Sequence, residues 1–125
     1  MSNLKYVFFV FLFFSCKDDY NKKDVEKMLN SNNTSQLVEA YYLIGEHKDT
    51  SFVKNIFSQI EDVRISHDLK FKGVSVYQSK MIALKKIYNV DPPNPLSKEV
   101  DKSLVDFYRE IAANNGHLND DNIPN

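Results

Sequence analysis

Several residue types are rare or absent in this chain, and each shortage excludes certain kinds of protein or binding site. Of its 125 residues only one is cysteine, three are glycine and none is tryptophan. A single cysteine excludes a disulfide framework within the chain and any metal site built from several thiolates. The isolated glycines leave no glycine-rich loop that could hold a phosphate group. Lys and Arg number 16 against 17 Asp and Glu, so the basic excess typical of nucleic-acid binders is missing and no nucleic-acid partner is expected.

Only one long apolar run is present, and it lies near the N-terminus. Residues 6–14 read YVFFVFLFF after Lys5, and Ser15, Cys16 and a charged segment follow. A membrane-spanning helix needs about 20 apolar residues, whereas the apolar part of a secretory signal has about 7–15. The run therefore predicts a cleaved signal peptide over residues 1–15.

The residues around Cys16 resemble a bacterial lipoprotein signal. Ser15 is the small residue expected before a lipidated cysteine, and Phe13 and Phe14 loosely fit the relaxed pattern of Bacteroidota lipoproteins. The resemblance implies that Cys16 carries acyl chains and anchors the protein in the outer membrane. Two or more acyl chains hold a protein on a bilayer stably, whereas one chain does so only marginally.

A second short motif follows the cysteine directly. The sequence Lys17-Asp18-Asp19 resembles the export signal of surface lipoproteins in the same group. The resemblance implies display on the cell surface, while a plain charged linker would leave the protein on the periplasmic face. Both faces of the outer membrane stay open at this point.

The rest of the chain predicts one all-α domain. We expect residues 16–23 to form the lipidated cysteine and a tether, residues 24–116 the helical domain, and residues 117–125 a polar tail. Apolar side chains recur at helical spacing in segments of about 24–29, 35–45, 51–60, 75–88 and 97–116. The prolines of residues 91–95 exclude a helix there. Residues 61–73 alternate only partly, so they predict either a hairpin or a loop.

The four longer segments predict two antiparallel helix pairs that resemble each other. Residues 40–45 match residues 83–88, and the stripe of residues 53–60 matches that of residues 100–107. A small residue, Ala40 or Ala83, at a helix crossing and an aliphatic residue one turn later resemble the first helix of a HEAT-type repeat. This resemblance implies about two stacked repeats, with the short first helix as a cap. An ordinary helix bundle has the same apolar periodicity and remains the alternative.

Residues with catalytic or metal-binding chemistry do not gather in the sequence. His47, His67 and His117 have no metal-ligand spacing to one another or to Cys16. No nucleophile motif surrounds any serine. We therefore predict no catalytic residue, no metal site and no cofactor.

The segment of residues 64–73 is the best candidate for function. It interrupts the helices and mixes basic with aromatic residues, and loops on a regular scaffold often carry binding sites. The candidate partner-binding residues are Arg64, His67, Lys70, Phe71 and Lys72. The sequence thus predicts a lipid-anchored, non-enzymatic domain that binds an unidentified protein. The alternatives are an envelope enzyme or enzyme accessory that uses this segment, and a purely structural loop.

Overall fold

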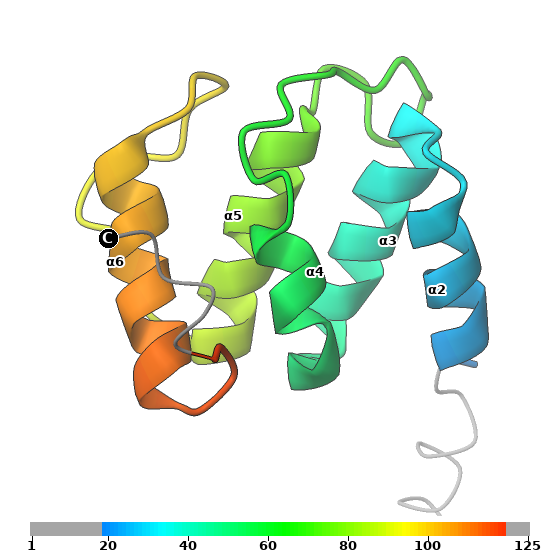
Figure 1. Cartoon of the computed structure of the whole chain (residues 1–125). Helices are drawn as coiled ribbons and strands as arrows, with labels where there is room; N and C mark the ends of the chain where they lie inside the picture. Colours follow the sequence, from blue (N-terminus) through cyan, green and yellow to red (C-terminus); the bar gives the residue numbers. More distant parts are fainter. Residues whose placement is uncertain (1–18, 120–125) are drawn as a thin grey trace, which may run out of the picture.

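The computed structural model describes residues 19–119, and within them the chain is all-helical (Figure 1). The helices are α2 (Lys22–Asn30), α3 (Thr34–Glu46), α4 (Val53–Phe57), α5 (Val76–Tyr88) and α6 (Lys102–Asn114), with a 3-10 helix, η1 (Thr50–Phe52), before α4. The predicted all-α class is confirmed. The signal peptide, Cys16, Lys17 and Asp18 lie outside the described residues, and Asp19 is exposed coil. None of the helices in residues 19–119 is long and apolar enough to cross a membrane.

Side-chain caps fix where the helices begin. Asn21, Asn33, Ser75 and Asp101 each accept a hydrogen bond from a backbone N–H in the first turn of the helix that follows. Such caps satisfy amides that have no partner within the helix. The last helix therefore begins after Asp101, later than the sequence had indicated.

Helix α3 lies between α2 and α5 and supplies much of the core. It approaches α5 closely at Gly45, where a Cβ atom would lie only 3.0 Å from the Cα of Ala83. Ala40 and Ala83 are both buried, as expected for small residues at a crossing. The largest fully buried side chains include Tyr77, Tyr108, Ile44, Ile56, Met81, Leu84 and Leu104.

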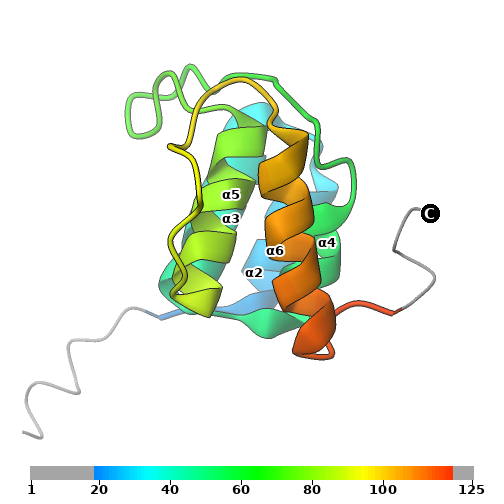
Figure 2. The same cartoon turned by 90° about the vertical axis from the view of Figure 1, so that its left-hand side faces the viewer.

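Helices α5 and α6 run parallel, so the second antiparallel pair expected from the sequence is wrong. At one end, the backbone N–H of Asp101 donates to the Tyr77 hydroxyl over 3.0 Å. At the other end, the Tyr88 hydroxyl lies 2.7 Å from Nδ1 of His117. Residues 89–101 run back along the helices before α6 starts (Figure 2). The chain direction alternates from α2 through α5, so only the step from α5 to α6 joins two consecutive described helices that run the same way.

Helix α4 ends at Phe57, although the apolar stripe predicted a helix up to Ile60. Gln59 has φ 49°, a left-handed conformation that a continuing helix cannot accommodate. Ile60 is nevertheless buried, at 9% exposure. The apolar periodicity therefore predicted the burial of Ile60 correctly, but it predicted too long a helix.

Both ends of the domain extend further than predicted. In the expected tether, Tyr20 donates to Oδ2 of Asp49 over 2.8 Å and stacks on His47 with ring centroids 4.2 Å apart. In the expected tail, Leu118 is 7% exposed and packs with Val53 and Ala112. Tyr20 and Leu118 therefore pack against the helices, although both lie outside the expected domain of residues 24–116.

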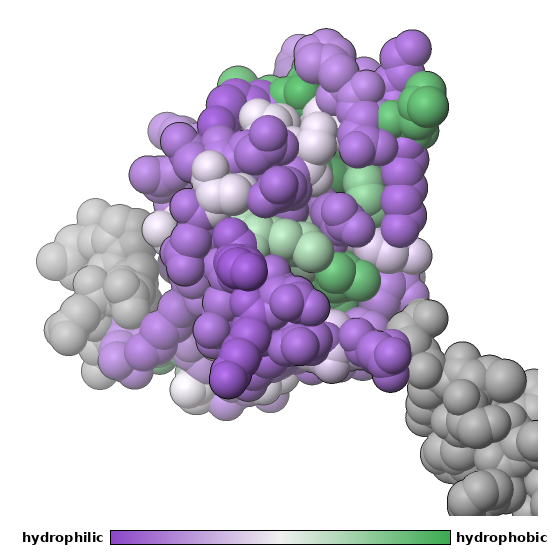
Figure 3. All heavy atoms as spheres, turned by 90° about the vertical axis from the view of Figure 1, so that its right-hand side faces the viewer, coloured by the Kyte–Doolittle hydropathy of each residue, from purple (hydrophilic) through white to green (hydrophobic). Residues whose placement is uncertain are grey.

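The surface on the α2 side is mainly hydrophilic. Figure 3 views the molecule from this side, and hydrophobic atoms appear only in small separate groups. The exposed large hydrophobic residues among the described ones are Tyr42, Val63, Ile65 and Leu69. Three of these four lie in the segment between α4 and α5.

Candidate functional site

The segment between α4 and α5 is fastened by its backbone to the start of α5. The carbonyl of Asp62 accepts from the N–H of Tyr77 over 2.7 Å, and that of Arg64 accepts from Val76 over 2.9 Å. Ile65 and Ser75 form one antiparallel bridge, the only pairing of strand type in the part of the chain that the structure describes. The segment is therefore a loop closed by a single bridge. The sequence had left a hairpin and a loop open, and the structure is intermediate between the two.

Residues 67–72, here called the apical loop, project beyond this bridge. The Oδ1 atom of Asp68 accepts from the N–H of Lys70 over 3.0 Å, and the N–H of Phe71 donates to the Asp68 carbonyl over 3.2 Å. Gly73 closes the loop with φ 84°, a left-handed conformation that favours glycine. At the tip, Leu69 is 93% exposed.

The base of the apical loop packs on an aromatic residue of α3. Phe71 lies against Tyr42 with ring centroids 5.3 Å apart. The Nζ atom of Lys70 is 5.4 Å from the Tyr42 centroid and 5.2 Å from that of Phe71, within the range of cation–π attraction. Lys86 lies 5.0 Å from the same Tyr42 ring and forms an ion pair with Glu46. The contacts of Lys70 and Phe71 with Tyr42 hold the loop against α3 and leave its tip exposed.

The five candidate binding residues do not form one site. Lys70 and Phe71 come together at Tyr42, while His67 and Lys72 are exposed elsewhere on the loop. Arg64 is turned away and fastens the segment to the turn between α2 and α3. Its NH2 atom lies 2.7 Å from Oδ2 of Asp62. The guanidinium also donates from NH1 to the Asn32 carbonyl over 3.3 Å and from NH2 to the Asn32 side-chain oxygen over 3.2 Å. The hydrogen bonds from Arg64 lower the pKa of the Asp62 carboxyl.

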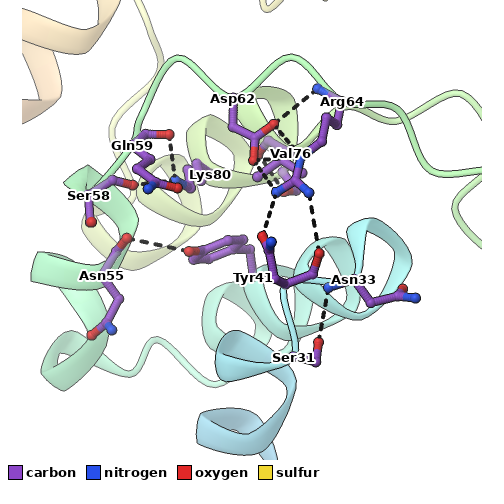
Figure 4. A network of polar contacts seen from close by, with 12 residues as sticks. Ser31, Asn33, Tyr41, Asn55, Ser58, Gln59, Asp62, Arg64, Val76 and Lys80 are labelled. Atoms are coloured by element: carbon purple, nitrogen blue, oxygen red, sulfur yellow. Dashed lines mark hydrogen bonds and ion pairs between the residues drawn. The ribbon is translucent and has the colours of Figure 1, made fainter.

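The contacts of Arg64 with Asp62 and Asn32 are here called the Arg64 clamp, and a buried lysine that was not predicted from the sequence lies next to it (Figure 4). Lys80 is 2% exposed, and its Nζ donates to the carbonyls of Ser58 over 2.6 Å and Gln59 over 3.0 Å. It also lies 5.2 Å from the centre of the Tyr41 ring. Burial lowers the pKa of Lys80 from 10.5 to about 8. The signal was present, because Lys80 falls at helical spacing between the buried Tyr77 and Leu84.

A pocket of about 200 Å³ opens beside Lys80. Its lining is rich in amide side chains and comprises Leu29, Asn30, Asn32, Leu37, Tyr41, Asn55, Ser58, Gln59, Asp62, Val76 and Lys80. The Tyr41 hydroxyl donates to the Asn55 carbonyl over 3.4 Å, and burial raises the pKa of Tyr41 to about 12. Because the Lys80 ammonium already binds two carbonyls directly after α4, its main role is to hold the C-terminal end of α4 in place.

Titratable residues that could bind a metal are not grouped in residues 19–119, where no cluster of three or more His, Cys, Asp or Glu side chains is found. Comparison of the chain with protein-family models, curated proteins and solved structures found no match.

Proposed function

We propose that the protein is a lipid-anchored, non-enzymatic domain of the bacterial cell envelope that binds a protein partner through the apical loop. The observation that carries this proposal is Leu69, an aliphatic side chain 93% exposed at the tip of a loop whose base is packed against Tyr42. Interface energy concentrates in a few side chains that fill pockets on the partner, while the residues around them exclude water. A tip that is already positioned by its base loses little conformational entropy on binding.

The anchor is proposed on the sequence around Cys16, which resembles a lipoprotein signal of the Bacteroidota. The first residues of α2 and the apical loop lie at opposite ends of the helices (Figure 1). A chain fixed to the outer membrane near Cys16 would therefore present the loop away from the bilayer. This arrangement suits a protein partner at either face of the membrane.

The HEAT-like part of the proposal is restricted to α3, α4 and α5. Neighbouring repeats place their first helices side by side, and α3 and α5 pack in this way at Gly45 and Ala83. Helix α6 does not complete a second antiparallel pair. The repeat is therefore proposed as one helix pair and the first helix of another.

No contact favours the alternative of an enzyme that uses residues 64–73. Arg64 binds Asp62 and Asn32, and Asp68 accepts the hydrogen bond that shapes the loop. Both side chains therefore serve the fold of the segment.

Site-specific photo-crosslinking in cells tests the binding proposal. A photoreactive residue in place of Leu69 should give a discrete protein adduct, while the same residue in place of Lys54, exposed on α4, should give none. In a second experiment the photoreactive residue replaces Lys70. The additional change Leu69→Ser should then reduce the adduct formed at position 70 without lowering the melting temperature. Equal adducts at both positions, or none at Leu69, would contradict the proposal.

A further inference from the structure

Residues 62–66 form a short extended segment, and one of its two edges is already used. The carbonyls of Asp62 and Arg64 and both backbone groups of Ser66 pair with residues 73–77. These are alternate residues, and the Ile65–Ser75 bridge pairs them as in an antiparallel ladder, while Val76 and Tyr77 are the first residues of α5. In such a ladder the backbone groups of the residues between them point to the opposite edge.

The opposite edge belongs to Val63 and Ile65. Among residues 19–119 the backbone N–H and C=O groups of these two residues have no hydrogen-bond partner. Their side chains lie on one face of the segment, since they are two positions apart. They are 55% and 40% exposed. The chain therefore presents unpaired backbone groups together with two apolar side chains.

We propose that residues 63–67 are an open β edge to which the partner protein adds an extended strand with apolar residues at alternate positions. This inference rests on the proposed function, because it names how the partner binds. Unpaired strand edges are templates for such pairing, and natural proteins usually protect them with charges or proline. Here the exposed positions are Val and Ile, and no proline interrupts the segment.

The geometry selects an extended strand of another protein as the occupant. A helix surface offers no free backbone donors and acceptors, whereas a strand offers both in alternation. A second copy of this segment fits less well. The two-fold pairing that sets Val63 opposite Ile65 also sets Arg64 opposite Arg64, and like charges directly opposite each other destabilise a strand pair.

Selection of a random peptide library against the full-length protein in detergent tests the edge. Selected peptides should alternate apolar and polar residues. On binding, the backbone amides of Val63, Ile65 and His67 should exchange more slowly with solvent by NMR. Ile65→Pro should weaken binding about tenfold, since proline removes one outward N–H and its ring hinders the approaching strand. Ile65→Thr, which keeps the amide and the β-branch, should weaken it less.

The inner amide of Ser66, bound to the Val74 carbonyl over 2.9 Å, is the internal control. It should stay protected in Ile65→Pro, because proline is accepted at an outward position of an edge strand. If the Ser66 amide loses its protection in Ile65→Pro, the pairing with residues 73–77 has opened, and Val63→Pro is tested as the second variant.

Three results would overturn the inference. They are failure to select any peptide, protection of amides other than the outward ones, and a concentration-dependent dimer that Ile65→Pro abolishes. The Leu69 crosslink separates the two proposals. If it forms while peptides ignore the edge, the partner binds only the apical loop. If peptides bind the edge and the crosslink fails, the apical loop is not the contact.

Discussion

Lys80 is the residue whose chemistry the fold changes most. Its ammonium is 2% exposed and lies among backbone carbonyls and the Tyr41 ring. A charged group in this position loses hydration that the unfolded chain keeps. The carbonyls of Ser58 and Gln59 need its protons, because α4 ends just before them. Burial therefore costs the Lys80 ammonium its hydration, and its hydrogen bonds to the two carbonyls fix the end of α4.

We expect the free energy of unfolding to rise between about pH 8 and pH 10. In this range the folded protein releases the Lys80 proton, since burial lowers the pKa to about 8, while the unfolded chain keeps it up to 10.5. Stability increases with pH wherever the unfolded state binds more protons, here by about 1–3 kcal/mol. Above pH 10 the trend should reverse, because burial raises the pKa of Tyr41, Tyr88 and Tyr108 to about 12.

Urea unfolding followed by circular dichroism at several pH values measures this dependence. Lys80→Met should abolish the rise, and Lys54→Met, at an exposed position on α4, should keep it. Only the slope with pH is compared, because Lys80→Met also leaves two carbonyls without a donor. A rise that persists in Lys80→Met would show that another group titrates.

At the scale of elements, the crossing of α3 and α5 gives a direct test of packing. Ala83→Leu places three more carbon atoms where a Cβ on Gly45 would already lie 3.0 Å from the Cα of Ala83. Overpacking of this kind costs about 1–3 kcal/mol. The melting temperature should fall for Ala83→Leu and change little for Ala113→Leu, at a half-buried position of α6. An unchanged melting temperature for Ala83→Leu would mean that the helices separate there at little cost.

The sequence could predict those features of the helices that depend on neighbouring residues. Apolar spacing predicted all the long helices, and Ser75 and Gly116 mark real ends, because caps and stops depend on a few neighbouring residues. The direction of α6 depends on the connection before it. Residues 89–101 could span roughly 40 Å when extended, twice the length of about 20 Å of α5. Both directions were therefore possible, and tertiary packing chose one.

The candidate site was predictable only in part for a related reason. Residue types indicated that the 64–73 segment was unusual, and Lys70 and Phe71 do share a cluster there. The role of Arg64 depends on Asn32, which is 32 residues away in the sequence. The exposed edge at Val63 and Ile65 follows from the pairing of Ser66 with Val74. Contacts between distant segments leave no local pattern.

At the scale of the whole molecule, the anchor decides where the apical loop is presented. Cys16→Ser should release the protein from membranes and abolish incorporation of labelled fatty acid, since acyl chains need the thiol. Membrane fractionation and metabolic labelling measure both effects. Replacement of Ser31, exposed after α2, by Ala should change neither. Continued membrane association of Cys16→Ser would show that something other than a lipid on this residue holds the protein.

The Arg64 clamp has a mechanical consequence for a tethered protein. If the partner is pulled, force enters at the apical loop and leaves through the start of α2, at the opposite end of the helices. The hydrogen bonds from Arg64 to Asn32 join the loop segment to the turn after α2, and the ion pair with Asp62 holds the guanidinium in place. Tension can therefore pass from the loop to α2 without first unravelling α3 and α4. The load is then shared by the two hydrogen bonds between Arg64 and Asn32. The clamp would let a small domain carry force between a membrane and its partner while remaining folded.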